Sequence, residues 1–182
     1  MSLRHFFIAS SLILAPITTL GFGSAAFANT ATDSIQLSGT VSSQILIEAT
    51  PTQAAADLPL SPEYADQNGW NMVQIADLNI TSNNTEGITI TASSTNDSEL
   101  VSTTNSSDKI TYGIAIVDSG AATPTSSSPL NNVSVPFSQS VTSGFNSDTG
   151  VKAMDLYIHY MVGGMPKQGT YTDTLTITVS DN

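Results

Sequence analysis

The closing stretch of the chain, Asp155–Asn182, reads DLYIHYMVGGMPKQGTYTDTLTITVSDN and decides the fold class. Two runs of alternating residues flank a break at residues 163–169 that is rich in glycine and proline. In the second run Leu175, Ile177 and Val179 alternate with threonines, so a pleated strand places the aliphatic side chains on one face and the hydroxyls on the other. Glycine accepts positive φ and proline fixes φ, as a loop requires. The stretch therefore predicts a pair of antiparallel β-strands.

Short strands separated by turns also fill the middle of the chain, and no stretch keeps an apolar stripe at helical spacing for three turns. We expect a hairpin between residues 70–80 and 88–92, and a long mobile loop over residues 120–132. Seven or eight strands predict an all-β fold, an antiparallel β-sandwich, with an open barrel as the alternative. The remaining expected strands are residues 34–49, 99–103, 109–117 and 133–141, and residues 50–66 form a connection with a short strand or one helical turn.

The N-terminus has the pattern of a secretory signal peptide. Arg4 and His5 precede an apolar run over residues 6–20, and Ala26-Phe27-Ala28 is an A-x-A cleavage site. Pro16 and the small residues that follow keep this run below the ~20 residues that a spanning helix needs. We predict cleavage after residue 28, a single β-sandwich domain over residues 29–182, no membrane insertion after cleavage, and a location in the periplasm, at the cell surface or outside the cell.

Charge and cysteine content exclude several classes of function. The chain has fifteen Asp and Glu against four Lys and Arg, for a formal net charge of −11, and it has no cysteine. An acidic surface repels phosphate backbones and anionic headgroups, so we expect no nucleic-acid partner and no membrane-surface partner. Without disulfides, an exported domain must be held together by packing and strand pairing.

Catalytic groups are scarce, and we predict no enzyme, no cofactor and no metal site. His159 has no visible catalytic partner and is expected on a half-exposed strand face. Trp70 and the tyrosines are candidates for a sugar-binding platform, although such residues more often belong to a sandwich core. No D-x-D-x-D-G calcium loop occurs. The acids instead stand singly in predicted turns, where they favour Asx-turns: Asp57, Glu63, Asp66, Asp97, Glu99, Asp108, Asp118 and Asp148.

Residues 169–179, GTYTDTLTITV, resemble the closing G-x-Y-x-D-x-hydrophobic-x-hydrophobic strand of the spore coat protein U family and its relatives, the subunits of archaic chaperone-usher pili. Three further segments agree with the resemblance: residues 35–41, 110–117 and 156–162.

The resemblance implies an immunoglobulin-like sandwich that lacks one strand. Such a subunit is held by a periplasmic chaperone, and it polymerises with copies of itself at an usher when the N-terminal segment of the next subunit fills the groove. By this resemblance the donor strand is anchored by Ile35, Leu37 and Val41, and the strand that borders the groove carries Leu175, Ile177 and Val179. The implied function is a non-enzymatic pilus- or coat-type subunit, with cell adhesion among its possible roles.

Two other functions remain open at this level. The first is a soluble secreted β-sandwich that recognises carbohydrate or another surface component through loops near Trp70 or residues 120–132. The second is a secreted hydrolase with paired carboxylates brought together from different strands.

Overall fold

A computed structural model describes residues 33–66, 68–125, 135–162 and 164–182. The chain divides into two units, Met1–Gly39 and Thr40–Asn182. The predicted signal peptide lies outside the described residues, as does most of the predicted loop over residues 120–132. Within the described part of the chain, no helix is long and apolar enough to cross a membrane.

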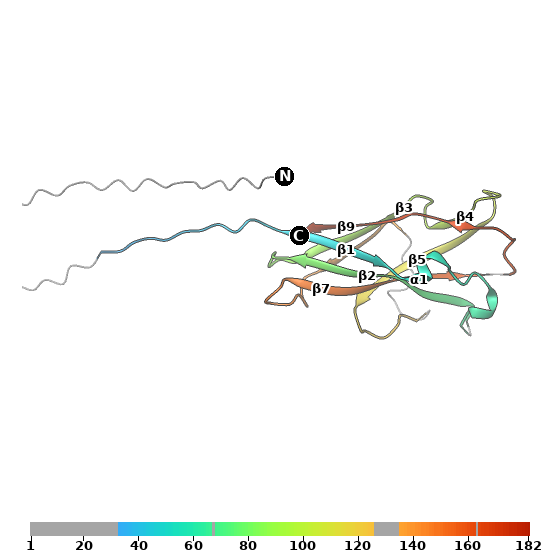
Figure 1. Cartoon of the computed structure of the whole chain (residues 1–182), viewed down its shortest axis with the longest axis horizontal. Coiled ribbons are helices and arrows are strands. Elements are labelled where there is room, and N and C mark those ends of the chain that lie inside the picture. The colour runs from blue at the N-terminus through green and yellow to red at the C-terminus, as the bar shows by residue number, and fades with distance from the viewer. Residues whose placement is uncertain (1–32, 67, 126–134, 163) are drawn as a thin grey trace, which may run out of the picture. The chain divides into compact units, whose positions relative to one another are not determined.

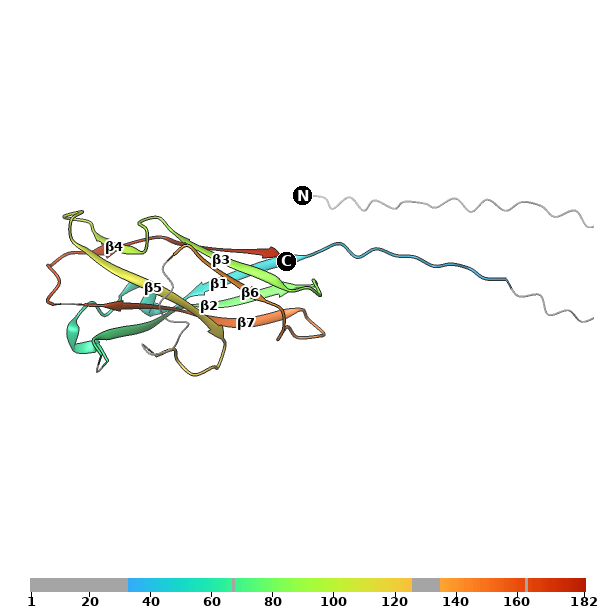
Figure 2. The same cartoon turned by 180° about the vertical axis from the view of Figure 1, so that it is seen from behind.

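The second unit is an antiparallel β-sandwich, which confirms the predicted fold class (Figures 1 and 2). Its six-stranded sheet has the order β1-β2-β7-β5-β4-β8, and its three-stranded sheet has the order β6-β3-β9. The described residues form nine strands rather than seven or eight, because the terminal run is divided into β8 and β9. The strands are β1 Ile45–Pro51, β2 Trp70–Ser82, β3 Ile88–Ser94, β4 Glu99–Ser102, β5 Lys109–Asp118, β6 Phe137–Val141, β7 Val151–Met161, β8 Tyr171–Thr172 and β9 Leu175–Asp181.

The connection between β1 and β2 contains two short helical turns, α1 (Gln53–Ala56) and a 3-10 turn (Pro62–Tyr64). The helical alternative for this segment is therefore confirmed, since residues 58–60 form no strand. The Tyr160 hydroxyl donates a hydrogen bond of 3.1 Å to the Pro59 carbonyl, which attaches the connection to the six-stranded sheet.

Both sheets contribute the side chains of the core, as alternation along half-buried strands predicts. In the three-stranded sheet Ile88 and Ile90 of β3 are fully buried, and in the six-stranded sheet Leu78 and Ile80 of β2 are fully buried. Tyr160 of β7 is buried with them, and burial raises the pKa of its hydroxyl to about 12, so the group stays protonated.

An irregularity in β2 changes which residues face the core. The register of β2 against β7 shifts between Gln74 and Ala76, with Ile75 as the extra residue. An extra residue reverses the alternation of side chains, so Val73 faces the same side as Ala76.

Two predicted strand pairings are wrong. Segments 70–80 and 88–92 form no hairpin, because β2 pairs with β1 and β7, whereas β3 pairs with β6 and β9. The last two strand regions do not pair either, because β5 occupies the edge of β7 that the terminal strand would need. In both cases the connection crosses from one sheet to the other, which side-chain alternation along a single strand does not reveal.

The first predicted strand, residues 34–49, begins later than expected. In the structure β1 starts at Ile45, and residues 33–44 have no strand partner in the described chain. Alternation alone does not make a strand, since the backbone groups also need a neighbouring strand to bond to.

Candidate functional site: an open seam between two edge strands

The strand β9 lies at the edge of the three-stranded sheet, and among the described strands it pairs with β3 alone. Leu175, Ile177 and Val179 stand opposite Ser94, Ala92 and Ile90, so their side chains share the core-facing side of the sheet. Ala92 and Ile90 are buried, whereas the three β9 side chains are only half-buried. The threonines between them are exposed, as the sequence predicted.

The hydrogen-bond phase of β9 decides where its backbone groups point. The Asn182 N–H donates to the Gly87 carbonyl, and the Thr95 N–H donates to the Thr174 carbonyl. Because bonded and non-bonded pairs alternate in an antiparallel ladder, the even-numbered residues of β9 bond to β3. The backbone groups of Leu175, Ile177 and Val179 therefore point away from β3, toward the open edge.

The same argument applies to β1, the edge of the six-stranded sheet. The Asn83 N–H donates to the Gln44 carbonyl and the Thr52 N–H to the Ile75 carbonyl, so even-numbered residues of β1 bond to β2. The backbone groups of Ile45, Ile47 and Ala49 point to the open side. The backbone of Pro51 also points to the open side, so its missing N–H removes no hydrogen bond between β1 and β2.

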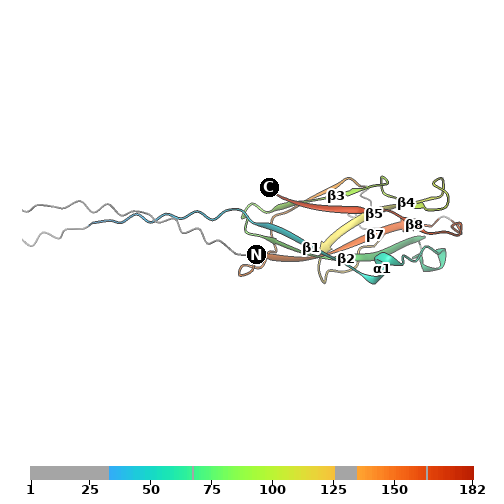
Figure 3. The ribbon, with the colours of Figure 1, turned by 45° about the horizontal axis from the view of Figure 1, so that its top comes forward.

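These two edges run side by side, and we call the strip between them the seam, formed by Ile45, Ile47 and Ala49 of β1 and by Leu175, Ile177 and Val179 of β9 (Figures 1 and 3). Ile47 and the three β9 side chains pack against the core without being buried. The hydroxyl of Ser43, two residues before β1, donates a hydrogen bond to the Asp181 carboxylate of β9, at the end of the seam where β1 begins. No backbone hydrogen bond joins β1 to β9 among the described residues.

The seam is narrower than a gap that already holds a strand. Some Cα atoms of β1 and β9 lie within 8 Å of each other. Two strands that flank a third are about 9.5 Å apart, given the usual spacing of about 4.7–4.9 Å between neighbours. A strand that enters the seam must therefore move the two edges apart.

The β9 side of the seam lacks the devices that usually protect a sheet edge. From Leu175 to Val179 the strand carries no charge, no proline and no glycine. Exposed edges of this kind pair readily with another chain, and stable monomers normally interrupt them with lysine, proline or a bulge. The β9 edge is therefore unprotected from Leu175 to Val179.

Asp173 holds β9 in place at the point where the chain crosses from one sheet to the other. Its carboxylate accepts hydrogen bonds from the hydroxyls of Ser94 (2.5 Å) and Tyr112 (2.7 Å), and from the backbone N–H groups of Asn96 (3.1 Å) and Thr174 (2.6 Å). Burial, together with the hydrogen bond and charge of Asp173, raises the pKa of Tyr112, so its hydroxyl remains a donor. We call Asp173, Ser94, Asn96 and Tyr112 the Asp173 clamp.

The residues predicted to form a donor strand are among the most exposed apolar side chains of the described chain. Ile35, Leu37 and Val41 are exposed by 86%, 92% and 85%. They occupy alternate positions around Gly39, so an extended strand presents them on one face. The structure brings the predicted β9 residues together with β1, a partner that the sequence did not identify. A signal was available, because Ile45 and Ile47 continue the same odd-numbered alternation.

His159 is buried rather than half-exposed, contrary to the sequence prediction. Its side chain is 4% exposed and lies beside Trp70, with 5.4 Å between the ring centroids. Its Nε2 has no hydrogen-bond partner among the described residues. No group of three or more His, Asp or Glu that could hold a metal ion occurs among the residues the structure describes.

The burial of His159 predicts that acid lowers the stability of the protein. Burial lowers the pKa of His159 below its ordinary value of 6.5, so the unfolded chain binds this proton more readily than the folded chain. The part of the stability that depends on neutral His159 is therefore fully present above about pH 6.5 and is lost as the pH drops toward the lowered pKa. We expect the free energy of unfolding, measured in urea, to decrease from pH 7 to pH 5 more steeply than in His159→Leu. Parallel pH profiles for the two proteins would contradict this expectation.

Comparisons with models of known protein families and with curated proteins found no match.

Proposed function

We propose that this protein is a non-enzymatic structural subunit that assembles by strand exchange, in which the segment Ile35–Val41 of one copy enters the seam of another. The observation that carries the proposal is the coincidence at the seam of half-buried core side chains and outward-pointing backbone groups on the same four residues, Ile47, Leu175, Ile177 and Val179. An added strand would cover the first and bond to the second at once.

The segment proposed to enter has matching properties. Its aliphatic side chains alternate with polar residues, and it carries no charge between Ser34 and Ser43. The exposed side chains of Ile35 and Leu37 gain about 1.5–3 kcal/mol each when they are fully buried, and this gain offsets the cost of ordering the segment. Strand addition therefore suits both partners.

The resemblance of residues 169–179 to the closing strand of the spore coat protein U family supports the same function. It adds a periplasmic chaperone and an usher as proposed partners, together with an exported location and an immunoglobulin-like fold that lacks one strand. In this view Asp173 of the motif keeps the receiving strand attached to its own sheet while the opposite edge stays open.

A pair of matched variants tests the proposal. Leu37→Asp places a charge on the face of the segment that would enter the seam, and Ser38→Asp places the same charge on the opposite face. Both residues are exposed, so neither change should affect folding of the sandwich. We expect the protein from Asn29 to Asn182 and its Ser38→Asp variant to form polymers in light scattering and negative-stain microscopy, whereas Leu37→Asp remains monomeric.

A peptide experiment tests directly whether the seam can accept a strand, even if the whole protein does not polymerise. The Leu37→Asp monomer keeps an empty seam, so a labelled peptide of residues 29–41 should form a complex with it that survives gel filtration. The same peptide with Leu37→Asp should not bind. Monomers in all three proteins, together with no binding of the unmodified peptide, would show a self-complete sandwich and rule out strand exchange.

A further inference from the structure

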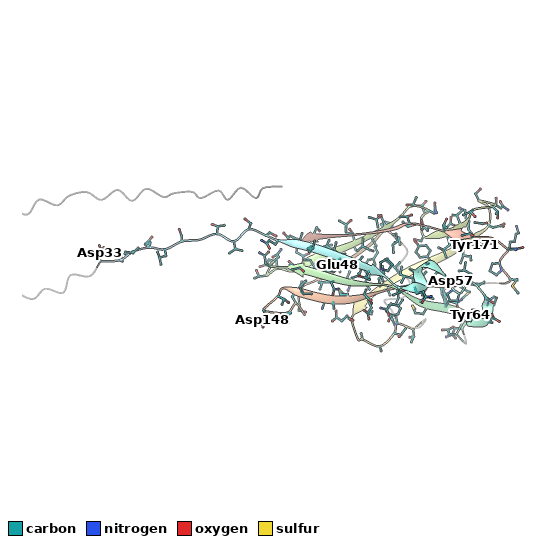
Figure 4. All side chains as sticks on the ribbon, viewed as in Figure 1. Asp33, Glu48, Asp57, Tyr64, Asp148 and Tyr171 are labelled. Carbon is teal, nitrogen blue, oxygen red and sulfur yellow. The ribbon has the colours of Figure 1, made fainter. Side chains whose placement is uncertain are left out.

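We propose that a cavity at one end of the sandwich binds a neutral pyranose sugar, a function that does not depend on strand exchange. The cavity has a volume of about 670 Å³, within the usual range of about 300–1,000 Å³ for small-molecule sites. It lies at the end of the sandwich that carries Tyr171, opposite the end that carries Asp148 (Figure 4). The lining residues that matter here are Trp70, Asp108, Lys109, Gly113, His159 and Lys167.

The floor of the cavity lies close to the sheet, because the residue opposite His159 is a glycine and has no side chain. Gly113 of β5 pairs with His159 of β7, and a Cβ atom added to Gly113 would lie 2.3 Å from the His159 Nε2. The imidazole ring therefore occupies the space directly over the glycine and lies down on the sheet. A larger residue at position 113 would force this ring upward into the cavity.

Trp70 supplies an aromatic wall beside this floor. Its ring contacts the His159 ring at an interplanar angle of 55°, so the indole is held in place before any ligand arrives. The Trp70 side chain is only half-buried, which leaves part of its surface open. An aromatic surface packs well against the C–H face of a sugar ring, and a wall that is already ordered loses little entropy on binding.

The polar groups of the cavity include a donor and acceptor pair. Lys109 also lines the cavity, but its Nζ lies 2.5 Å from a carboxylate oxygen of Glu99, a residue outside the lining. The Lys167 Nζ lies 2.6 Å from Asp108 Oδ1, and both of these residues line the cavity. A pair of this kind presents an ammonium donor beside a carboxylate acceptor, which matches the two adjacent hydroxyls of a sugar, since each hydroxyl both donates and accepts.

The charge balance favours a neutral sugar over an acidic one. Each lysine of the cavity is already matched by a carboxylate, so no excess positive charge remains to attract an anion. The chain as a whole has a formal net charge of −11, which repels anionic ligands at long range. A neutral pyranose needs no excess positive charge in the cavity and is not repelled by the net negative charge of the chain.

The chain contains its own reporter for this site, because Trp70 is its only tryptophan. Titration of the protein with methyl glycosides of glucose, mannose, galactose and N-acetylglucosamine should change the tryptophan fluorescence in a saturable way for at least one of them. We expect a Kd of about 1 mM for this sugar, as for a small ligand with few contacts. The methyl glycoside of glucuronic acid should bind more weakly than that of glucose.

Two matched variants complete the test. Asp108→Asn removes one acceptor from the cavity and should weaken binding at least tenfold. Asp148→Asn is the same substitution on an exposed residue at the opposite end of the sandwich and should leave Kd unchanged. Saturable binding that depends on Asp108 alone would establish the site. The proposal fails if none of the neutral glycosides gives a saturable signal, if the glucuronide binds more tightly than the glucoside, or if the two variants weaken binding equally.

Discussion

Replacing Asp173 with alanine is expected to lower the free energy of unfolding by about 3–4 kcal/mol, because several part-buried donors lose their acceptor together. Tyr112 is buried and donates its hydroxyl to Asp173, and Ser94 donates to the same carboxylate oxygen. Once the carboxylate is removed, the side-chain hydrogen bonds that join β3, β5 and the start of β9 are lost, and only the backbone pairing of β3 with β9 remains. Urea unfolding followed by circular dichroism measures the loss.

Two further variants show whether the loss comes from the Asp173 clamp. Asp173→Asn keeps one oxygen that can accept from the Asn96 and Thr174 N–H groups, so we expect a smaller loss of about 1–2 kcal/mol. Thr176→Ala removes an exposed hydroxyl from the same strand and should change stability by no more than about 0.5 kcal/mol. An Asp173→Ala protein as stable as Thr176→Ala would show that the clamp contributes nothing.

Gly87→Ala is expected to destabilise the protein by about 2–4 kcal/mol, for two reasons that add. Gly87 has φ of +89°, a conformation that L side chains rarely adopt, and a Cβ atom there would lie 2.4 Å from the Val141 carbonyl oxygen and 2.7 Å from the Thr142 Cα. Both contacts are with backbone, which cannot move aside as a flexible side chain can. Thermal and urea unfolding should both report the change.

Gly120→Ala is the matched control for this substitution. Gly120 has a similar φ of +78°, but an added Cβ atom would meet nothing within 4 Å. Only the conformational cost applies, so we expect a loss of about 1 kcal/mol. Equal losses in the two variants would mean that the close approach of β6 to Gly87 is relieved without cost.

The sequence predicted one of the two strands that form the candidate site. The alternation of Leu175, Ile177 and Val179 with threonines is local, and any strand geometry converts it into one apolar face and one polar face. The structure confirms this division and the half-buried state of the aliphatic residues. The other half of the seam, Ile45 and Ile47, was assigned to one long strand with the exposed segment before it, because alternation does not show where a strand gains a neighbour.

His159 is a second example of what alternation along one strand does not predict. Strand alternation in β7 places it on the face opposite Leu156 and Ile158. The sequence suggested a half-exposed face, which is wrong, since the burial of a face depends on what covers it. Gly113 and Trp70 reach His159 from two other strands, and neither is its neighbour in sequence.

The amino-acid sequence by itself determined that this chain folds into antiparallel strands packed as a sandwich, because side-chain period and turn residues act over a few neighbouring positions. Only the tertiary structure decided which strands pair, where the chain changes sheets at Asp173, and that the open edges of β1 and β9 lie together. These features depend on which backbone groups are already bonded to a neighbour. That information is shared between segments far apart in the chain, and no local pattern contains it.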